Sequence, residues 1–299
     1  MTRFLPDYRA HIIHTTVAGP RSEIWRLLLG IAVMVGVYVL FAMFYQQAIF
    51  ELARYRPTFE EELLAGSTPL AMYVLLASFG LFTLSVFGVV KVLHKRDALS
   101  VLGPLILAVP QFFRVILVLA IVCLALMVLP PYDMGGLPVP NMGLGLWTVL
   151  LPLSLIAVFI QISAEEVFFR GYLQQQLGAR FRSPLVWMGI PSVLFAIGHY
   201  QPAEAGENAV IIVVWAGLFG VLMADLTARA GSIGPALAVH FVNNVTALLI
   251  TSLPDALGGL ALWHTPFGME DAEQLRAWLP VDFAMMIVSW LAARLALRR

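Results

Sequence analysis

Charged residues are scarce in this sequence of 299 residues: only 12% are Asp, Glu, Lys or Arg, whereas 60% are hydrophobic. Soluble domains carry about 25% charged residues. The composition, with a mean hydropathy of +0.87, therefore excludes a soluble domain and predicts a polytopic membrane protein. The 18 basic residues are balanced by 18 acidic ones, and this lack of a positive surplus argues against nucleic acid as a partner.

Cysteine is almost absent, and the single Cys123 excludes an internal disulfide. It lies in the apolar run 115–129 with no histidine nearby, so we interpret it as a buried filler rather than a nucleophile. Internal repeats and low-complexity tracts are also missing, and we treat residues 1–299 as a single membrane domain. The first apolar run is too long for the h-region of a signal peptide and lacks a small-x-small cleavage site, which favours a membrane span.

Long apolar runs are abundant. Crossing a hydrocarbon core of about 30 Å takes about 20 apolar residues in a helix. By this test we predict an all-α fold with about eight transmembrane helices, some of them near the lower length limit. The predicted spans are residues 24–50, 70–92, 112–129, 144–169, 184–200, 209–226, 233–253 and 281–297. We interpret residues 103–110 as a re-entrant or interfacial piece and residues 270–278 as a short surface helix.

The basic residues gather on one side of this predicted topology. All but three of the 18 fall in the terminal segments, in alternate loops or at the span ends next to them, the exceptions being Arg54, Arg56 and Arg276. Cytoplasmic segments are enriched in Lys and Arg. We therefore predict a multi-pass protein of a bacterial cell membrane with both termini in the cytoplasm.

Ionisable side chains stand at the end of the fourth predicted span. Glu165, Glu166 and Arg170 follow the apolar run 144–160, where charged groups are costly and usually mark function. On a helix Glu166 and Arg170 are four residues apart and can pair. Glu165 lies about 100° around the helix and is left without that partner. This asymmetry is typical of a catalytic glutamate held beside a structural one.

Polar residues in two later spans extend this set. His199 lies in the fifth span, while His240 and Asn244 lie four residues apart on one face of the seventh. The helical rise places Glu165 and His199 both about 20 Å from the turn between their spans, and His240 somewhat lower. These groups are therefore able to converge in a buried polar active-site cavity.

Other ionisable residues have simpler interpretations. We expect Asp225 to pair with Arg229 at i+4, and Arg114 to extend towards the headgroups. The remaining four histidines fall in predicted loops or termini and are interpreted as solvated: His11, His14, His94 and His264.

Three motifs occur in order, each in a predicted span, and together they resemble the motif set of the CPBP intramembrane proteases. That family includes the Rce1-type CAAX prenyl endopeptidases and the Abi group of bacteriocin-processing or immunity proteins. The resemblance covers residues 150–253, which we designate the catalytic core. The motifs are Glu165-Glu166-x-x-x-Arg170, Phe195-x-x-x-His199 and His240-x-x-x-Asn244.

The resemblance implies an intramembrane endopeptidase acting on a membrane-associated peptide or protein, of the CAAX type in eukaryotic members. It implies that Glu165, assisted by His199, activates a water as general base against the scissile amide. His240 and Asn244 would stabilise the oxyanion. The two other motif residues would hold the motif helix and tune the base: Glu166 and Arg170.

Two mechanisms stay open at this point, because such proteins are often labelled metalloproteases. Glu165, His199 and His240 could supply three ligands to Zn²⁺, with water as the fourth. The sequence has no His-Glu-x-x-His motif, and a metal-free glutamate mechanism fits the residues as well. We favour the metal-free mechanism slightly and expect no other cofactor.

Two other functions also stay open. A non-enzymatic immunity or binding protein on the same fold is expected to lose catalytic residues, whereas this chain keeps all of them. A transporter or proton pathway also uses intramembrane Glu and His. Transporters commonly show inverted repeats, which this sequence lacks.

Overall fold

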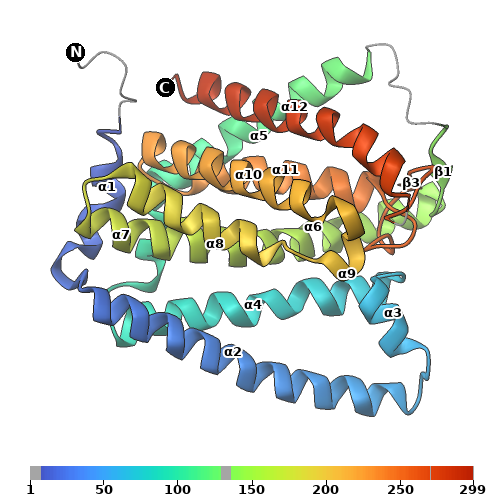
Figure 1. Cartoon of the computed structure of the whole chain (residues 1–299), viewed down its shortest axis with the longest axis horizontal. Helices are drawn as coiled ribbons and strands as arrows, with labels where there is room; N and C mark the ends of the chain where they lie inside the picture. The colour runs from blue at the N-terminus through green and yellow to red at the C-terminus, as the bar shows by residue number, and fades with distance from the viewer. Residues whose placement is uncertain (1–7, 129–135, 270, 299) are drawn as a thin grey trace.

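The structure is a computed structural model that describes residues 8–128, 136–269 and 271–298. Its long helices run antiparallel to their chain neighbours in one bundle (Figure 1). Within the described residues, six helices are long and apolar enough to cross a membrane, which confirms the all-α, polytopic prediction. They are α2 (Ile24–Ala53), α4 (Pro69–Val92), α5 (Leu105–Met127), the helix Leu144–Arg180, the helix Pro202–Ala230 and α12 (Ala272–Leu297).

Two shorter apolar helices correspond to the fifth and seventh predicted spans, Leu185–Gly198 and Gly234–Ile250. Both contain a π-helical stretch, in which hydrogen bonds run from i to i+5. The first consists of η4 (Leu185–Gly189) and α8 (Ile190–Gly198), and the second of α11 (Gly234–Val245) and η6 (Thr246–Ile250).

The longest crossing is built from three segments, α6 (Leu144–Glu166), the π-helix η3 (Val167–Gln174) and α7 (Gln175–Arg180). The helix Pro202–Ala230 consists of α9 (Pro202–Ala205), η5 (Gly206–Asn208) and the long helix α10 (Ala209–Ala230). The remaining elements are short: α1 (His11–Thr15), η1 (Thr16–Arg21), α3 (Phe59–Ala65), η2 (Ala98–Leu102), and the strands β1 (Val139–Pro140), β2 (Thr251–Ser252) and β3 (Trp263–His264).

The three strands form a small sheet that the sequence did not predict, at the end of the bundle opposite α1 (Figure 1). The middle strand β3 pairs antiparallel with β1 and parallel with β2. Asn141, just after β1, donates from its side chain to the carbonyls of Gly258 (3.0 Å) and Ala261 (2.8 Å). The sheet therefore links the chain that enters α6 to the chain that leaves α11.

The sharp turn between α10 and α11 sets the position of the seventh crossing. Gly231 ends α10 in the left-handed conformation, with φ +73°, and its N–H donates to the carbonyl of Thr227. Pro235 stands in the first turn of α11, where a missing N–H costs nothing. Two crossings thus follow one another with almost no linker.

Two predicted surface pieces are parts of long helices instead. Residues 105–110 are the first turns of α5, because Gly234 of α11 lies directly against the backbone of Ala108 and gives these turns a protein partner. Residues 272–278 are the first turns of α12, tied to η5 by hydrogen bonds between Arg276 and Asn208 (3.1 Å) and from Asn208 to the Ala272 carbonyl (2.8 Å). The re-entrant piece and the separate surface helix were therefore wrong predictions.

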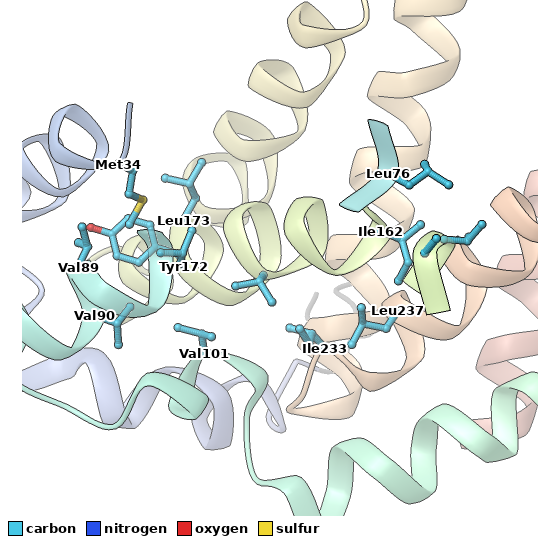
Figure 2. Close-up of a cluster of buried hydrophobic side chains, with 14 of the residues drawn as sticks. Met34, Leu76, Val89, Val90, Val101, Ile162, Tyr172, Leu173, Ile233 and Leu237 are labelled. Atoms are coloured by element: carbon cyan, nitrogen blue, oxygen red, sulfur yellow. The ribbon is translucent and has the colours of Figure 1, made fainter. Parts of the chain in front are cut away.

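The hydrophobic core consists of two large clusters on either side of the α6–α11 pair. One joins α2, α4, α6 and α11, and Figure 2 shows Ile162 and Leu237 within it, with Tyr172 near Val89. The other joins α5, α8, α10, α11 and α12. Cys123 is half-buried in α5 rather than fully buried.

The N-terminal segment, residues 8–21, folds against the end of α7 and has its polar residues inside. His11 and His14 are buried, as is His94, so the prediction that they are solvated was wrong. His14 contacts the carbonyl of Arg170 (Nε2 to O, 3.1 Å), whereas Ile12 and Ile13 are exposed. Apolar groups outside and polar groups inside suit a segment at a membrane surface, where lipid replaces water.

The predicted pair of Asp225 and Arg229 is confirmed, with Nε 2.8 and 2.9 Å from the carboxylate oxygens. Both side chains are buried, and the carboxylate also accepts from Tyr8 (2.8 Å) and Trp290 (3.0 Å). Through this carboxylate the N-terminal segment and α12 meet on α10. Figure 1 accordingly places α1 and the C-terminal end of α12 at the same end of the molecule.

Acidification should loosen the N-terminal segment. Burial lowers the pKa of His11 to about 3 and that of His14 to about 4, from an ordinary value of 6.5. Between pH 6.5 and these values, each histidine binds a proton when the N-terminal segment is released from α7 but not when it is packed there. Each histidine therefore weakens this packing by about 1.4 kcal/mol for every unit that the pH falls. Hydrogen-exchange protection of residues 8–21, corrected for the intrinsic pH dependence, should fall between about pH 7 and about pH 5.

The matched control is a double variant, His11→Gln with His14→Gln, which keeps polar groups but removes both titrations. Its protection should vary much less over the same pH range. An equally steep loss of protection in the double variant would contradict the assignment to these two histidines.

Candidate active site

The end of α6 and the π-helix that follows it carry the predicted motif helix. Glu165 and Glu166 are the last two residues of α6, and Arg170 lies in η3. Gly171 allows the backbone of η2 to come close, since a Cβ there would lie 2.9 Å from the carbonyl of Val101. π-Helical stretches inside long helices are frequent at functional sites.

Glu166 and Arg170 form the predicted ion pair, with 3.0 Å between Arg170 Nη1 and Glu166 Oε1. Both side chains are buried, so each charge depends on the other for neutralisation. Arg170 also donates from Nη2 to the carbonyl of Gly220 (3.3 Å), and its guanidinium lies 4.8 Å from the centre of the Phe195 ring. The pair thereby ties the motif helix to α8 and α10.

His240 lies between the two glutamates. Its Nδ1 is 2.8 Å from Glu166 Oε1, and its Nε2 is 3.7 Å from Glu165 Oε2. An ionised carboxylate only accepts hydrogen bonds, so Nδ1 carries the hydrogen that Glu166 receives. Nε2 is the nitrogen left facing Glu165. The ring of Phe219, with centroids 5.0 Å apart, packs edge-on against the imidazole and fixes its orientation.

A chain of side-chain amides reaches Glu165 from α11. Gln161 donates from Nε2 to Glu165 Oε1 (2.6 Å) and accepts from Asn244 Nδ2 (2.8 Å). Asn243 in turn donates to Asn244 Oδ1 (3.1 Å). Gln161 and Asn243 were not among the predicted site residues. The available signal for Gln161 was a buried amide in an apolar span, one helical turn before Glu165.

His199 stands at the C-terminal cap of α8, apart from this network. Its Nδ1 is 2.8 Å from the carbonyl of Phe195, and its ring packs on the Phe195 ring with centroids 4.4 Å apart. No hydrogen bond or ion pair within the described part of the chain joins His199 to Glu165. The Phe195 ring also contacts His240, with centroids 6.5 Å apart, so both histidines pack against the same side chain.

The candidate zinc ligands do not form a metal site. Among the described residues, no group of three or more His, Cys, Asp or Glu side chains could hold a metal ion. His240 contacts Glu165 and Glu166, whereas His199 contacts the carbonyl and the ring of Phe195. The structure thus does not group Glu165, His199 and His240 as the ligands of one zinc ion.

A cavity of about 540 Å³ lies between α4, α6 and α11, with an almost wholly apolar lining. On α6 it is lined by residues that include Ile160 and Ser163. Ser163 lies two residues, or about 200° of helix rotation, from Glu165. Glu165 therefore faces away from the side of α6 that lines this apolar cavity.

Two adjacent glutamates, one of them fully buried, lie with an arginine, a histidine and a chain of amides inside a helical bundle. These features define a polytopic membrane protein with an intramembrane polar site. The family model described as "Type II CAAX prenyl endopeptidase Rce1-like" matches residues 146–246, a range that includes all six predicted site residues. The chain is also 31% identical over 255 residues to "Uncharacterized protein YyaK" of Bacillus subtilis, covering 80% of this chain and 82% of that protein.

No solved structure matches the chain. The chain belongs to the Rce1-like type II CAAX prenyl endopeptidase family, also called CPBP.

Removing the positive partner of Glu166 should destabilise the fold. Arg170→Met leaves a buried carboxylate whose Oε2 already has no partner, and breaking such a pair costs about 3–5 kcal/mol. The midpoint of thermal unfolding in detergent should fall markedly. The double variant Arg170→Met with Glu166→Gln should regain part of the loss.

The neighbouring carboxylate provides the control for this prediction. Glu165 bonds an amide and its side chain is 19% exposed, so Glu165→Gln should change stability by less than about 1 kcal/mol. Equal shifts for Glu165→Gln and Arg170→Met would contradict the different roles given to the two glutamates.

Proposed function

We propose that this protein is an intramembrane endopeptidase that hydrolyses a peptide bond of a membrane-associated peptide or protein, CAAX-type substrates included. One observation carries the proposal: two adjacent glutamates face one histidine, but only Glu166 is neutralised by an arginine. Membership of a family of prenyl endopeptidases supports it. The same membership does not favour a transport role.

Glu165 is the general base in this proposal. Gln161 occupies Oε1, so Oε2, which faces His240, is the oxygen available to a water molecule. As the water oxygen bonds to the scissile carbonyl carbon, Glu165 takes the water proton and later passes it to the departing amine. Water, amide and carboxylate supply every atom of this hydrolysis.

The remaining polar groups bind and stabilise the reacting amide. Nε2 of His240 faces Glu165 and is free to contact water or substrate, since Nδ1 is committed to Glu166. Asn244 uses one amide hydrogen for Gln161 and has a second for the developing oxyanion. His199 packs on Phe195 and uses Nδ1 for a carbonyl, which leaves Nε2 for a substrate or water that would bridge it to the cluster.

The arrangement in the membrane is part of the proposal. We take residues 150–253 as the catalytic core of a single domain, with both chain ends on the cytoplasmic side of a bacterial cell membrane. The distribution of basic residues supports this orientation. A bacterial relative that matches most of the chain supports the bacterial location.

Replacing the base should abolish cleavage without abolishing folding. Detergent-purified wild type should cleave members of a peptide library, and Glu165→Gln should reduce the rate by about 10²–10⁴-fold, the usual contribution of a general base. Glu204→Gln, which changes an exposed carboxylate on α9, is the matched control and should cleave like wild type.

A strong chelator separates the two mechanisms, and the metal-free one predicts unchanged wild-type cleavage. Loss of cleavage on chelation would contradict it. Equal cleavage by Glu165→Gln and wild type would contradict the role of Glu165. Ion flux in proteoliposomes that depends on Glu165, with no cleavage, would favour the transport alternative instead.

A further inference from the structure

Gln161 is the residue of the polar cluster whose presence the proposed function does not by itself explain. It lies one helical turn before Glu165 on α6, and only 8% of it is exposed. An amide inside a membrane span is retained only where its polar atoms have partners. Both ends of the Gln161 amide are used, one by Glu165 on its own helix and the other by Asn244 on α11.

The hydrogen bonds of this chain have one possible direction when Glu165 is ionised. A carboxylate only accepts, so Gln161 must present its NH₂ group to Glu165 and its carbonyl oxygen to Asn244. Asn244 must then present its NH₂ group to Gln161, leaving its own oxygen to accept from Asn243. All three amide dipoles therefore point their positive ends towards the carboxylate of Glu165.

A purely structural role for Gln161 would be a bond between two helices. The contact of Gln161 with Asn244 alone would satisfy that role. The second contact, 2.6 Å from Nε2 to Glu165 Oε1, is unexplained by helix pairing, because residues four apart on one helix are already held together by the backbone. This bond constrains rotation of the glutamate side chain instead.

We infer that Gln161 is a positioning residue that holds Glu165 with Oε2 towards His240 and couples this orientation to Asn244. The inference rests on the proposed function for its effect on the reaction. The Gln161 side chain bonds both the base on α6 and the oxyanion donor on α11. Glu165 and Asn244 therefore do not move independently of each other. Misplacement of a catalytic group by about 1 Å costs about 10²-fold in rate.

Gln161→Met tests the inference, since it keeps the length of the side chain and removes both hydrogen bonds. The turnover number kcat should fall by about 10- to 100-fold while KM changes less than about twofold. In a Glu165→Gln background the same substitution should lower the residual rate by less, because only the part that acts through Asn244 remains. An equal loss in both backgrounds, or an unchanged kcat, would overturn the inference.

A second variant guards against a folding defect in the first. Gln161→Glu keeps the shape of the side chain but places a carboxylate against Glu165, so it should also lower kcat at neutral pH. The thermal midpoint of each variant is compared with that of Thr148→Val, which alters an exposed hydroxyl on α6 that bonds only the carbonyl of Leu144. Full activity in a folded Gln161→Glu would overturn the inference.

Infrared spectroscopy of protein labelled with ¹³C-carboxyl glutamate tests the contact without any substrate. The difference between wild type and Glu165→Gln isolates the carboxylate bands of Glu165. Gln161→Met should shift these bands, whereas Thr148→Val should leave them in place. Absence of a shift overturns the inference, even if the protein cleaves peptides. A shift in a protein that cleaves nothing supports the contact and rejects only the proposed function.

Discussion

A buried carboxylate must be neutralised, and the rest of this site is arranged around how Glu166 meets that requirement. Arg170 reaches it from the π-helical turn of its own crossing, and His240 reaches it from α11. Arg170 in addition bonds the carbonyl of Gly220 on α10. One charge therefore fixes three helices relative to each other, and separating them would leave that charge unpaired in an apolar interior.

The neighbouring glutamate is held in a different way, and this difference gives the site its chemistry. Glu165 has no arginine, only the amide of Gln161 on one oxygen and the imidazole of His240 at 3.7 Å from the other. Its side chain is also the more exposed of the two. A carboxylate supported by neutral groups keeps its charge available to accept a proton, whereas a carboxylate paired with a guanidinium has that charge neutralised.

The segment of the motif helix that follows the two glutamates, η3 and α7, is held by polar contacts. The hydropathy of the sequence does not reveal these contacts. In η3 and α7 the carbonyl of Arg170 meets His14, and the hydroxyl of Tyr172 meets His94, 2.9 Å away. Gln175 donates to the carbonyls of His14 and Ser100, both at 2.8 Å. The N-terminal segment and η2 thus brace the helix that carries the two glutamates, although neither belongs to the region that the family model matches.

Local helix geometry and composition were enough to predict the apolar helices and the ion pairs within single helices. The eight predicted spans correspond to the six long and two shorter apolar helices of the described residues. The pairs Glu166–Arg170 and Asp225–Arg229 form because residues four apart on a helix are neighbours whatever surrounds them.

The contacts between different helices could not be predicted from these local rules. The bridging position of His240, the place of Gln161 between Glu165 and Asn244, and the burial of His14 all join residues more than 70 positions apart. Such contacts depend on how helices rotate and pack, for which one hydrophobic pattern allows many solutions. The spacing of the motifs was sufficient to select most of the polar site residues. Which of these residues contact one another depends on how the helices pack.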